Sequence, residues 1–521
     1  MSLSNTSGLF TERMFGKLSD MIRDNRYTIL GSLISGFLAY TFMIANKLPN
    51  HDELYSLFTK GTTIESGRWG LELVSLLFPD VSIPWLYGVL SILILTIGAC
   101  MIVRMFSIKS KVLQFLLGGL IIAFPSQIGT FTFMYTATAY AAAFLLSVAV
   151  AWLVCKEDKK LHMIAACCMV LSLSIYQAYF AITVSLLILH LFFRLLYDRE
   201  EAGNVFSKGL YAVLFLIASF LLYWIATKIV WRLSGIGMGD YASSALSLDI
   251  RSFAERIGNA YVSFFRILRY RSNSIITTRL SVVIHFLLLG LTGIAAFVFV
   301  AEKKKPGQIL LLLLLLLMLP LGINSMFLVF QEGSIHTLVL YSYISLYVLF
   351  AGMIEYGICT ERLQKTWTKL LGNMADLAVM GMAVILASNI YVANKAYLNM
   401  HLAYENTYYY TTSILNRLQD TPGYTKESKV AIIGEYQLPD FYYEQFYDLM
   451  QLMGTRKLSP NAYSIEGFFE LYNGVKINFA SAEQKKSLAQ SAEFHAMESY
   501  PNYGYIQTID DVIVIKLSDI S

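Results

Sequence analysis

Eleven apolar segments, most of them long enough to cross a bilayer, follow one another along the first three quarters of this chain. A helix rises about 1.5 Å per residue, so about 20 apolar residues span the hydrocarbon core. Of the 521 residues, 56% are hydrophobic and 15% are charged, whereas about a quarter of a soluble domain is charged. The spans are predicted at 27–45, 85–103, 112–125, 134–155, 161–175, 176–194, 208–231, 280–301, 307–323, 335–356 and 371–393.

Two of these spans are shorter than a bilayer requires. The third, at 112–125, and the fifth, at 161–175, are predicted to be re-entrant or tilted inside the bundle. The fifth and sixth spans are joined by almost no loop, so the division between them is the least defined.

Basic residues predict the orientation of the spans. If the N-terminus is cytoplasmic, every inner loop carries Lys or Arg, at 104–111, 156–160, 194–208, 303–305 and 362–369. The outer loops at 126–133 and 324–334 carry neither. Cytoplasmic loops are enriched in these residues, so we expect residues 394–521 to lie outside.

The expected fold is an all-α polytopic membrane protein with a small C-terminal extracytoplasmic α/β domain. Residues 1–26 form a cytoplasmic segment, and 27–393 form the membrane domain, with outer loops 46–84 and 232–279 that each contain an amphipathic helix. Residues 394–521 form the outer domain. Its strands are predicted at 429–434, 505–509 and 512–516, and its helices at 439–453 and 463–472.

An acidic pair, Asp52 and Glu53, follows the first span directly. A carboxylate beside a low-dielectric wall can have its pKa raised towards the working pH, which suits a general base acting on an acceptor hydroxyl. The alternative interpretation is a pair of solvated loop acids, or an N-cap for the next turn. Their position at the outer mouth of the bundle favours catalysis.

Arginines in the two outer loops are candidate ligands for phosphate. Arg68 is followed by Trp69, whose indole could stack on a sugar face. Arg266, Arg269 and Arg271 precede the eighth span and could bind a phosphate leaving group. The alternatives are a Trp and Arg anchor at the membrane interface for the first pair and ordinary anionic lipid binding for the second group.

Several polar side chains lie near the outer ends of spans. Tyr135, Tyr176, Gln177 and Glu332 could line a sugar-sized chamber, and a protonated His336 could bind phosphate. Hydrogen bonds between neighbouring helices would explain each of these residues individually.

The sequence predicts no cofactor and no nucleic-acid partner. It contains no Walker loop, no nucleophile elbow, no zinc-protease motif and no dinucleotide fingerprint. The five cysteines lack the spacing of metal ligands. A divalent metal remains open, because one acidic pair supplies too few ligands to argue for a hard cation.

Short motifs of the chain resemble the bacterial glucosyltransferase type II membrane family of the O-antigen-modifying kind. The likeness lies in their residues and in their order along the chain. They are His51-Asp52-Glu53 and Gly67-Arg68-Trp69 within Pro49–Trp69, Phe124-Pro125-Ser126 with a following Tyr135, Ser174-Ile175-Tyr176-Gln177, and the outer segment Lys429–Gly434.

The resemblance implies a glycosyltransferase of the GT-C class in the bacterial cytoplasmic membrane. Its partners would be a polyprenyl-phosphate-linked hexose donor, with glucose expected, a cell-surface glycan acceptor and membrane lipids. Asp52 would be the base and Glu53 its neighbour. One alternative is a transporter or flippase of lipid-linked sugars, although the spans lack the mid-depth charges and paired repeats typical of transporters. Another is a non-catalytic assembly subunit, which would tolerate the loss of both acids.

Overall fold

The computed structural model describes residues 16, 19–48, 50, 54, 64–77, 81–156, 158–197, 200–239, 253–269, 275–276, 278–302, 305–329, 336–359, 365–436, 452 and 464–519. Four predicted site residues, Asp52, Glu53, Arg271 and Glu332, lie outside these ranges.

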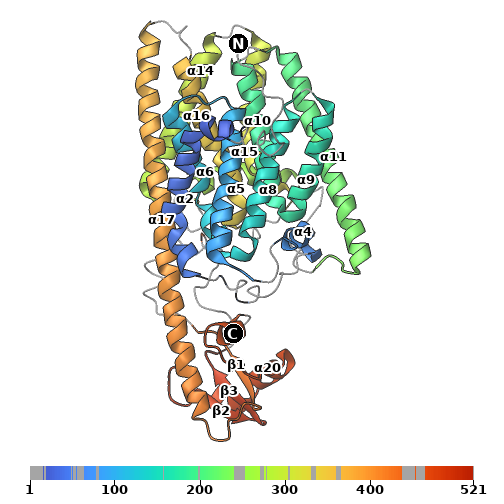
Figure 1. Cartoon of the computed structure of the whole chain (residues 1–521), viewed down its shortest axis with the longest axis vertical. Coiled ribbons are helices and arrows are strands. Elements are labelled where there is room, and N and C mark those ends of the chain that lie inside the picture. Colours follow the sequence, from blue (N-terminus) through green and yellow to red (C-terminus); the bar gives the residue numbers. More distant parts are fainter. Residues whose placement is uncertain are drawn as a thin grey trace.

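The body of the molecule is a bundle of long helices that run side by side, with a small domain below it (Figure 1). All eleven predicted spans overlap helices of this bundle. They are α2 (Arg26–Asn46), α5 (Pro84–Met105), α6 (Lys111–Ile122), α8 (Met134–Val154), α9 (Lys159–Ile175), α10 (Phe180–Tyr197), α11 (Ala202–Ser234), α14 (Arg279–Glu302), α15 (Pro306–Ile323), α16 (Ile344–Cys359) and α17 (Lys365–Gln419).

Fewer than eleven of these helices are long enough to span a bilayer unaided. Within the described ranges, nine segments are long and apolar enough, or ten if one bent pair is a single span. The bent pair is α6 and the short helix α7 (Ser126–Thr132), which meet at 49°. Helix α9 has 17 residues. The third predicted span therefore corresponds to a bent pair of helices, and the fifth to a helix too short to pass the length test.

Buried tyrosine hydroxyls donate hydrogen bonds to backbone carbonyls around the break between α6 and α7. The last carbonyls of a helix lack partners within it. Here Tyr40 of α2 donates to Ile122 O over 2.8 Å, and Tyr341 donates to Ile121 O over 2.8 Å. Tyr397 of α17 donates to Ile128 O over 2.9 Å. A break in a membrane helix is tolerated where surrounding protein supplies such partners.

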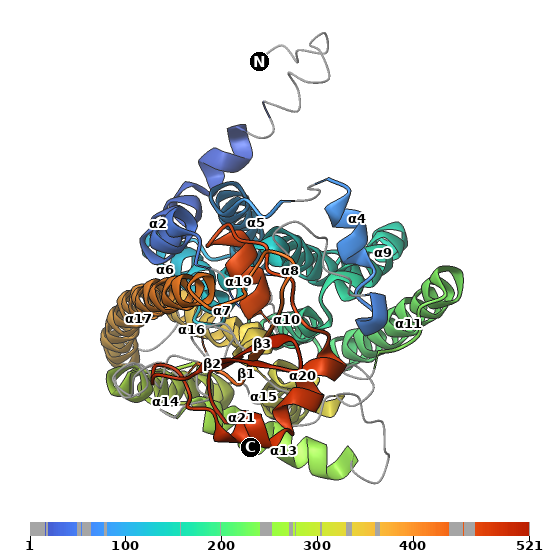
Figure 2. The same cartoon turned by 90° about the horizontal axis from the view of Figure 1, so that it is seen from below.

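The two predicted outer loops, 46–84 and 232–279, each contain a helix, and both helices lie at the same end of the bundle. Helix α4 (Gly70–Ser75) and α13 (Phe253–Ile267) lie at the end that carries the C-terminal domain (Figure 2), opposite the end that bears the N label in Figure 1. Helix α13 is fixed there by Asn324 at the end of α15, whose side-chain amide donates to Ala260 O over 2.8 Å.

The C-terminal domain is built on a three-stranded sheet in the order β1-β3-β2. Strand β1 (Lys429–Ile433) is parallel to β3 (Val512–Lys516), and β2 (Ile506–Ile509) is antiparallel to β3. The β2–β3 turn uses Asp510 and Asp511, both with positive φ, as tight hairpins require. All three predicted strands are therefore present.

Helices pack on both faces of this sheet. They include α19 (Ile465–Leu471), α20 (Ala482–Ala489) and α21 (Ala492–Ala496). Helix α17 continues from the bundle without a break, so Tyr410, Ile414 and Leu418 on its last turns join the domain core. The helix predicted at 463–472 matches α19, whereas the one predicted at 439–453 lies almost entirely outside the described residues.

Candidate functional site

The segment from Ile64 to Gly70 is fastened to helix α11 by one stripe of side chains. Tyr223 donates to Gly67 O over 3.1 Å, and Trp231 donates to Ile64 O over 2.7 Å. Between them, Trp69 Nε1 donates to Thr227 Oγ1 over 3.1 Å. Positions 223, 227 and 231 are four residues apart, so they share one helix face. This segment opens with the 3₁₀ helix η1 (Ile64–Ser66) and leads into α4.

Two glycines allow this segment to approach its neighbours closely. Gly67 has φ of 74°, and a Cβ there would lie 2.6 Å from the Tyr223 hydroxyl. A Cβ on Gly70 would lie 2.3 Å from Ser174 Oγ, on α9. A residue with a side chain would clash at either position, and at Gly67 it would also be strained. The glycines therefore fix Arg68 and Trp69 between α9 and α11.

Arg68 is half-buried against two stacked tyrosine rings. Its guanidinium carbon lies 5.2 Å from the Tyr176 ring centroid, and its Nη1 donates to the Tyr140 hydroxyl over 3.4 Å. The Tyr140 and Tyr176 rings stack with centroids 4.3 Å apart. A cation over an aromatic face is stabilised by the ring quadrupole. The guanidinium is thus held beside the Tyr140 and Tyr176 rings, and the Arg68 side chain stays partly exposed.

Gln177 joins this group from the 3₁₀ helix η2 (Gln177–Tyr179) between α9 and α10. Its Nε2 donates to Ser66 O and to the Tyr223 hydroxyl, each over 2.9 Å. Its Oε1 accepts from Arg68 Nε over 3.4 Å. Because both ends of the amide are engaged, Gln177 orients the guanidinium and ties the loop to α11. The structure therefore brings together Arg68, Trp69, Tyr176 and Gln177, which the sequence analysis proposed separately.

The residues on either side of the acidic pair are anchored at the same end of the bundle. Asn50 is buried, its backbone N–H donates to Thr132 O over 3.3 Å, and its side-chain amide donates to Thr132 Oγ1 over 3.4 Å. Thr132 is the last residue of α7. Leu54 is also buried, and its carbonyl lies 3.1 Å from where a Cβ on Gly467 of α19 would be. Asn50 therefore contacts the bundle, and Leu54 lies against the C-terminal domain.

Other predicted residues are placed elsewhere. Arg266 is exposed on α13 and donates to Ser263 Oγ over 2.8 Å, and Arg269 is exposed just beyond that helix. Helix α13 and helix α4 lie on opposite sides of the bundle in Figure 2. His336 is exposed before the 3₁₀ helix η6 (Thr337–Tyr343), and Tyr135 is half-buried at the start of α8.

Sequence reasoning missed Tyr140, Tyr223, Thr227 and Trp231. The last three carry a detectable signal, because they recur every four residues in a predominantly apolar span. Tyr140 carries no comparable signal. Because polar groups in a membrane helix face the bundle interior or a cavity, this repeat predicts that Tyr223, Thr227 and Trp231 face inward.

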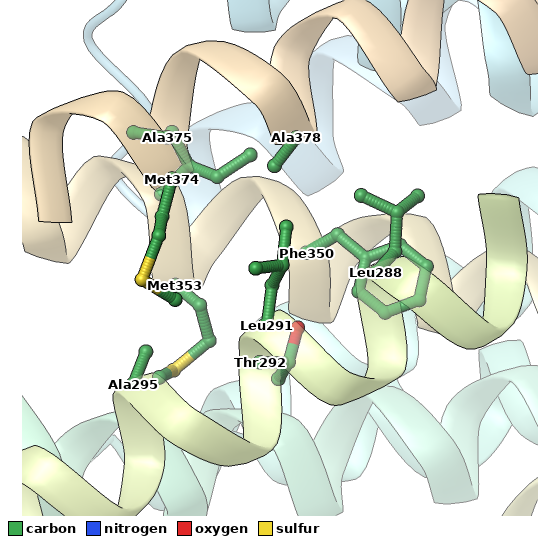
Figure 3. A pocket seen from close by; sticks show the side chains of 10 residues that line it. Leu288, Leu291, Thr292, Ala295, Phe350, Met353, Met374, Ala375 and Ala378 are labelled. Atoms are coloured by element: carbon green, nitrogen blue, oxygen red, sulfur yellow. The ribbon is translucent and has the colours of Figure 1, made fainter. Parts of the chain in front are cut away.

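A small cavity of about 40 Å³ lies within the bundle, between α14, α16 and α17. Figure 3 shows that its walls are apolar, with Leu288, Phe350 and Met353 among them and Thr292 as the polar exception. Sugar binding requires placed polar groups, so this cavity is no candidate for the chemistry at Arg68. Within the described ranges, no three His, Cys, Asp or Glu side chains are arranged to hold a metal ion.

A family described as Glucosyl transferase GtrII matches residues 41–350. These are 310 of the 521 residues, more than half of the chain, and they include Asn50, the Arg68 group and α11. A search of curated proteins finds no match.

Proposed function

This chain belongs to the Glucosyl transferase GtrII family, and we propose that it transfers a hexose, expected to be glucose, from a polyprenyl-phosphate donor to a cell-surface glycan. The observation that carries the proposal is the position of Arg68. Its half-buried guanidinium lies against the Tyr140 and Tyr176 rings, at the bundle end where Asn50 and Leu54, the described residues on either side of the acidic pair in the sequence, make their contacts. We place this end on the outer face of the bacterial cytoplasmic membrane.

In this proposal Arg68 binds the donor phosphate. A guanidinium is planar, permanently charged and able to donate two parallel hydrogen bonds to phosphate oxygens. Its orientation is set by Gln177 and by the ring of Tyr176. The half-buried ring of Trp69 supplies an apolar face for the hexose, while its Nε1 stays bonded to Thr227. The buried ring of Tyr176, stacked on Tyr140, supports the Arg68 guanidinium.

Asp52 is the proposed general base, with Glu53 beside it. The acceptor hydroxyl attacks the anomeric carbon as its proton passes to the Asp52 carboxylate. The bond from that carbon to the phosphate oxygen breaks, and polyprenyl phosphate leaves with the electron pair. Asp52 is two residues from both anchors, Asn50 and Leu54, so chain length keeps it within roughly 7 Å of each Cα. It must come within about 3 Å of the acceptor oxygen.

The remaining predicted residues have supporting roles in this proposal. Arg266, Arg269, Arg271 and His336 would attract phosphate headgroups. Tyr135 and Glu332 would contact the sugar or the acceptor.

The test is transfer by purified protein in liposomes that contain labelled polyprenyl-phosphate glucose and a candidate acceptor polysaccharide. Label appearing in the polysaccharide supports the enzyme. Label crossing the bilayer without any transfer would identify a transporter instead. Arg68→Ala provides the paired variant, and it should lose transfer while inserting into membranes like the wild type.

A further inference from the structure

Lys228 is an exposed cation on the outward face of α11, among apolar side chains and one turn before Arg232. Helix α11 stands at the edge of the bundle (Figures 1 and 2), and Leu221, Ile225 and Ile229 are all more than half exposed on it. Lys228 is exposed beside them.

Two indoles hold this lysine. Its Nζ lies 4.9 Å from the Trp224 ring centroid and 5.0 Å from the Trp231 ring centroid. The two rings meet edge to face, with centroids 5.9 Å apart. In the described part of the chain no carboxylate lies within ion-pair distance of Lys228, whereas Lys208 of the same helix pairs with Glu200 at 2.6 Å. The ammonium of Lys228 is therefore positioned by π-faces and keeps its hydrogen-bond donors for a ligand.

The depth of Lys228 matches that of a lipid headgroup. No charged residue occurs between Lys208 and Lys228. Twenty residues of helix rise about 30 Å, which is the thickness of the hydrocarbon core. If Lys208 lies at one boundary of the core, Lys228 lies at the other, where lipid phosphates reside.

Lys228 is also adjacent to the Arg68 site. Trp231 donates to Ile64 O, and Thr227, next to Lys228, accepts from Trp69. One helical stretch thus faces the site with Tyr223, Thr227 and Trp231, and faces the lipid with Lys228. We propose that Lys228, held between Trp224 and Trp231, binds the phosphate of the lipid-linked donor as it enters the Arg68 site from the bilayer alongside α11. This inference rests on the proposed function and adds a donor-binding residue and an entry route.

The test uses the full chain in lipid nanodiscs and compares the wild type with Lys228→Gln, Lys228→Arg and Arg232→Gln. Arg232 is a matched control, because it is exposed one turn further along α11. Binding of three probes is measured: a long-chain polyprenyl phosphate, phosphatidylglycerol and inorganic phosphate. The KM for the donor and kcat are measured in parallel.

We expect Lys228→Gln to weaken polyprenyl phosphate binding, and to raise the donor KM, by about tenfold, with kcat little changed. Lys228→Arg should retain most of the binding, and Arg232→Gln should match the wild type. Unchanged polyprenyl phosphate binding by Lys228→Gln overturns the inference and would mean that Lys228 only anchors α11 at the membrane interface. An equal loss for phosphatidylglycerol, an equal effect of Arg232→Gln, or tight Lys228-dependent binding of inorganic phosphate also overturns it.

The binding measurements distinguish a failure of this inference from a failure of the proposed function. If the wild type transfers no sugar but binds polyprenyl phosphate through Lys228, the function fails and the lipid site stands. If the wild type transfers sugar and Lys228→Gln has a normal donor KM, the function stands and the site at Lys228 fails.

Discussion

Trp69 and Thr227 are joined by a hydrogen bond of 3.1 Å, although they lie 158 residues apart in the chain. The bond connects the loop that carries Arg68 to the lipid-facing helix α11. Together with the bonds from Tyr223 and Trp231, it makes the shape of the site depend on how α11 packs. A change at this contact should therefore affect both stability and transfer.

Gly67→Ala should lower the free energy of unfolding by more than the strain of a positive φ alone would. An alanine there adopts a strained φ and also meets the Tyr223 hydroxyl, which is bonded to Gln177. We expect the free energy of unfolding to fall by roughly 2–3 kcal/mol. Gly235→Ala has a similar φ of 69° but open space around it, so it should cost about 1 kcal/mol. Thermal unfolding in detergent measures both, and equal losses would show that the Tyr223 contact is unimportant.

Arg68→Lys should impair transfer although the charge is kept. A lysine has a compact ammonium in place of the planar fork, so it cannot keep the bonds to Gln177 and Tyr140 together with the contact to the Tyr176 ring. We expect kcat/KM to fall by roughly 10–100-fold, the equivalent of about 1.4–2.8 kcal/mol. Arg232→Lys, on the exposed end of α11, is the control and should be nearly neutral. Wild-type kinetics in Arg68→Lys would mean that only the charge matters.

Tyr341→Phe should destabilise the bundle at the break between α6 and α7. It removes the hydroxyl that serves the Ile121 carbonyl and leaves that buried acceptor unsatisfied. The expected loss is about 1–3 kcal/mol. Tyr391→Phe, at an exposed position on α17, should change the unfolding temperature very little. If Tyr341→Phe and Tyr391→Phe unfold at the same temperature, the break between α6 and α7 does not depend on this hydrogen bond.

The membrane spans could be predicted from the sequence because the bilayer sets their length and apolar character. The same requirement of length explains why eleven spans are predicted, whereas nine helices of the described ranges, or ten with the bent pair, are long and apolar enough to cross a bilayer. Helices α6 and α9 are shorter than a full span, so a sequence window marks them as spans although they do not pass the test of length by themselves. The C-terminal strands were predictable from their runs of Val and Ile, such as Val512–Ile515.

The assembly of the Arg68 group was not predictable to the same extent. Hydropathy does not reveal which face of an apolar helix turns inward, and Tyr140 is separated from Arg68 by 72 residues. Tyr223 reaches Gly67 across 156 residues. The sequence identified Arg68, Tyr176 and Gln177 from their chemistry and their position near span ends. Only the packing of α8, α9 and α11 shows that they form one group.

The most direct test of the account is sugar transfer by Asp52→Asn, measured beside Glu53→Gln in liposomes loaded with labelled polyprenyl-phosphate glucose. Both proteins should insert and melt like the wild type. The account predicts that Asp52→Asn loses transfer by at least about 100-fold, the usual contribution of a general base, and that Glu53→Gln is affected less. Wild-type transfer by a stably inserted Asp52→Asn protein would contradict it.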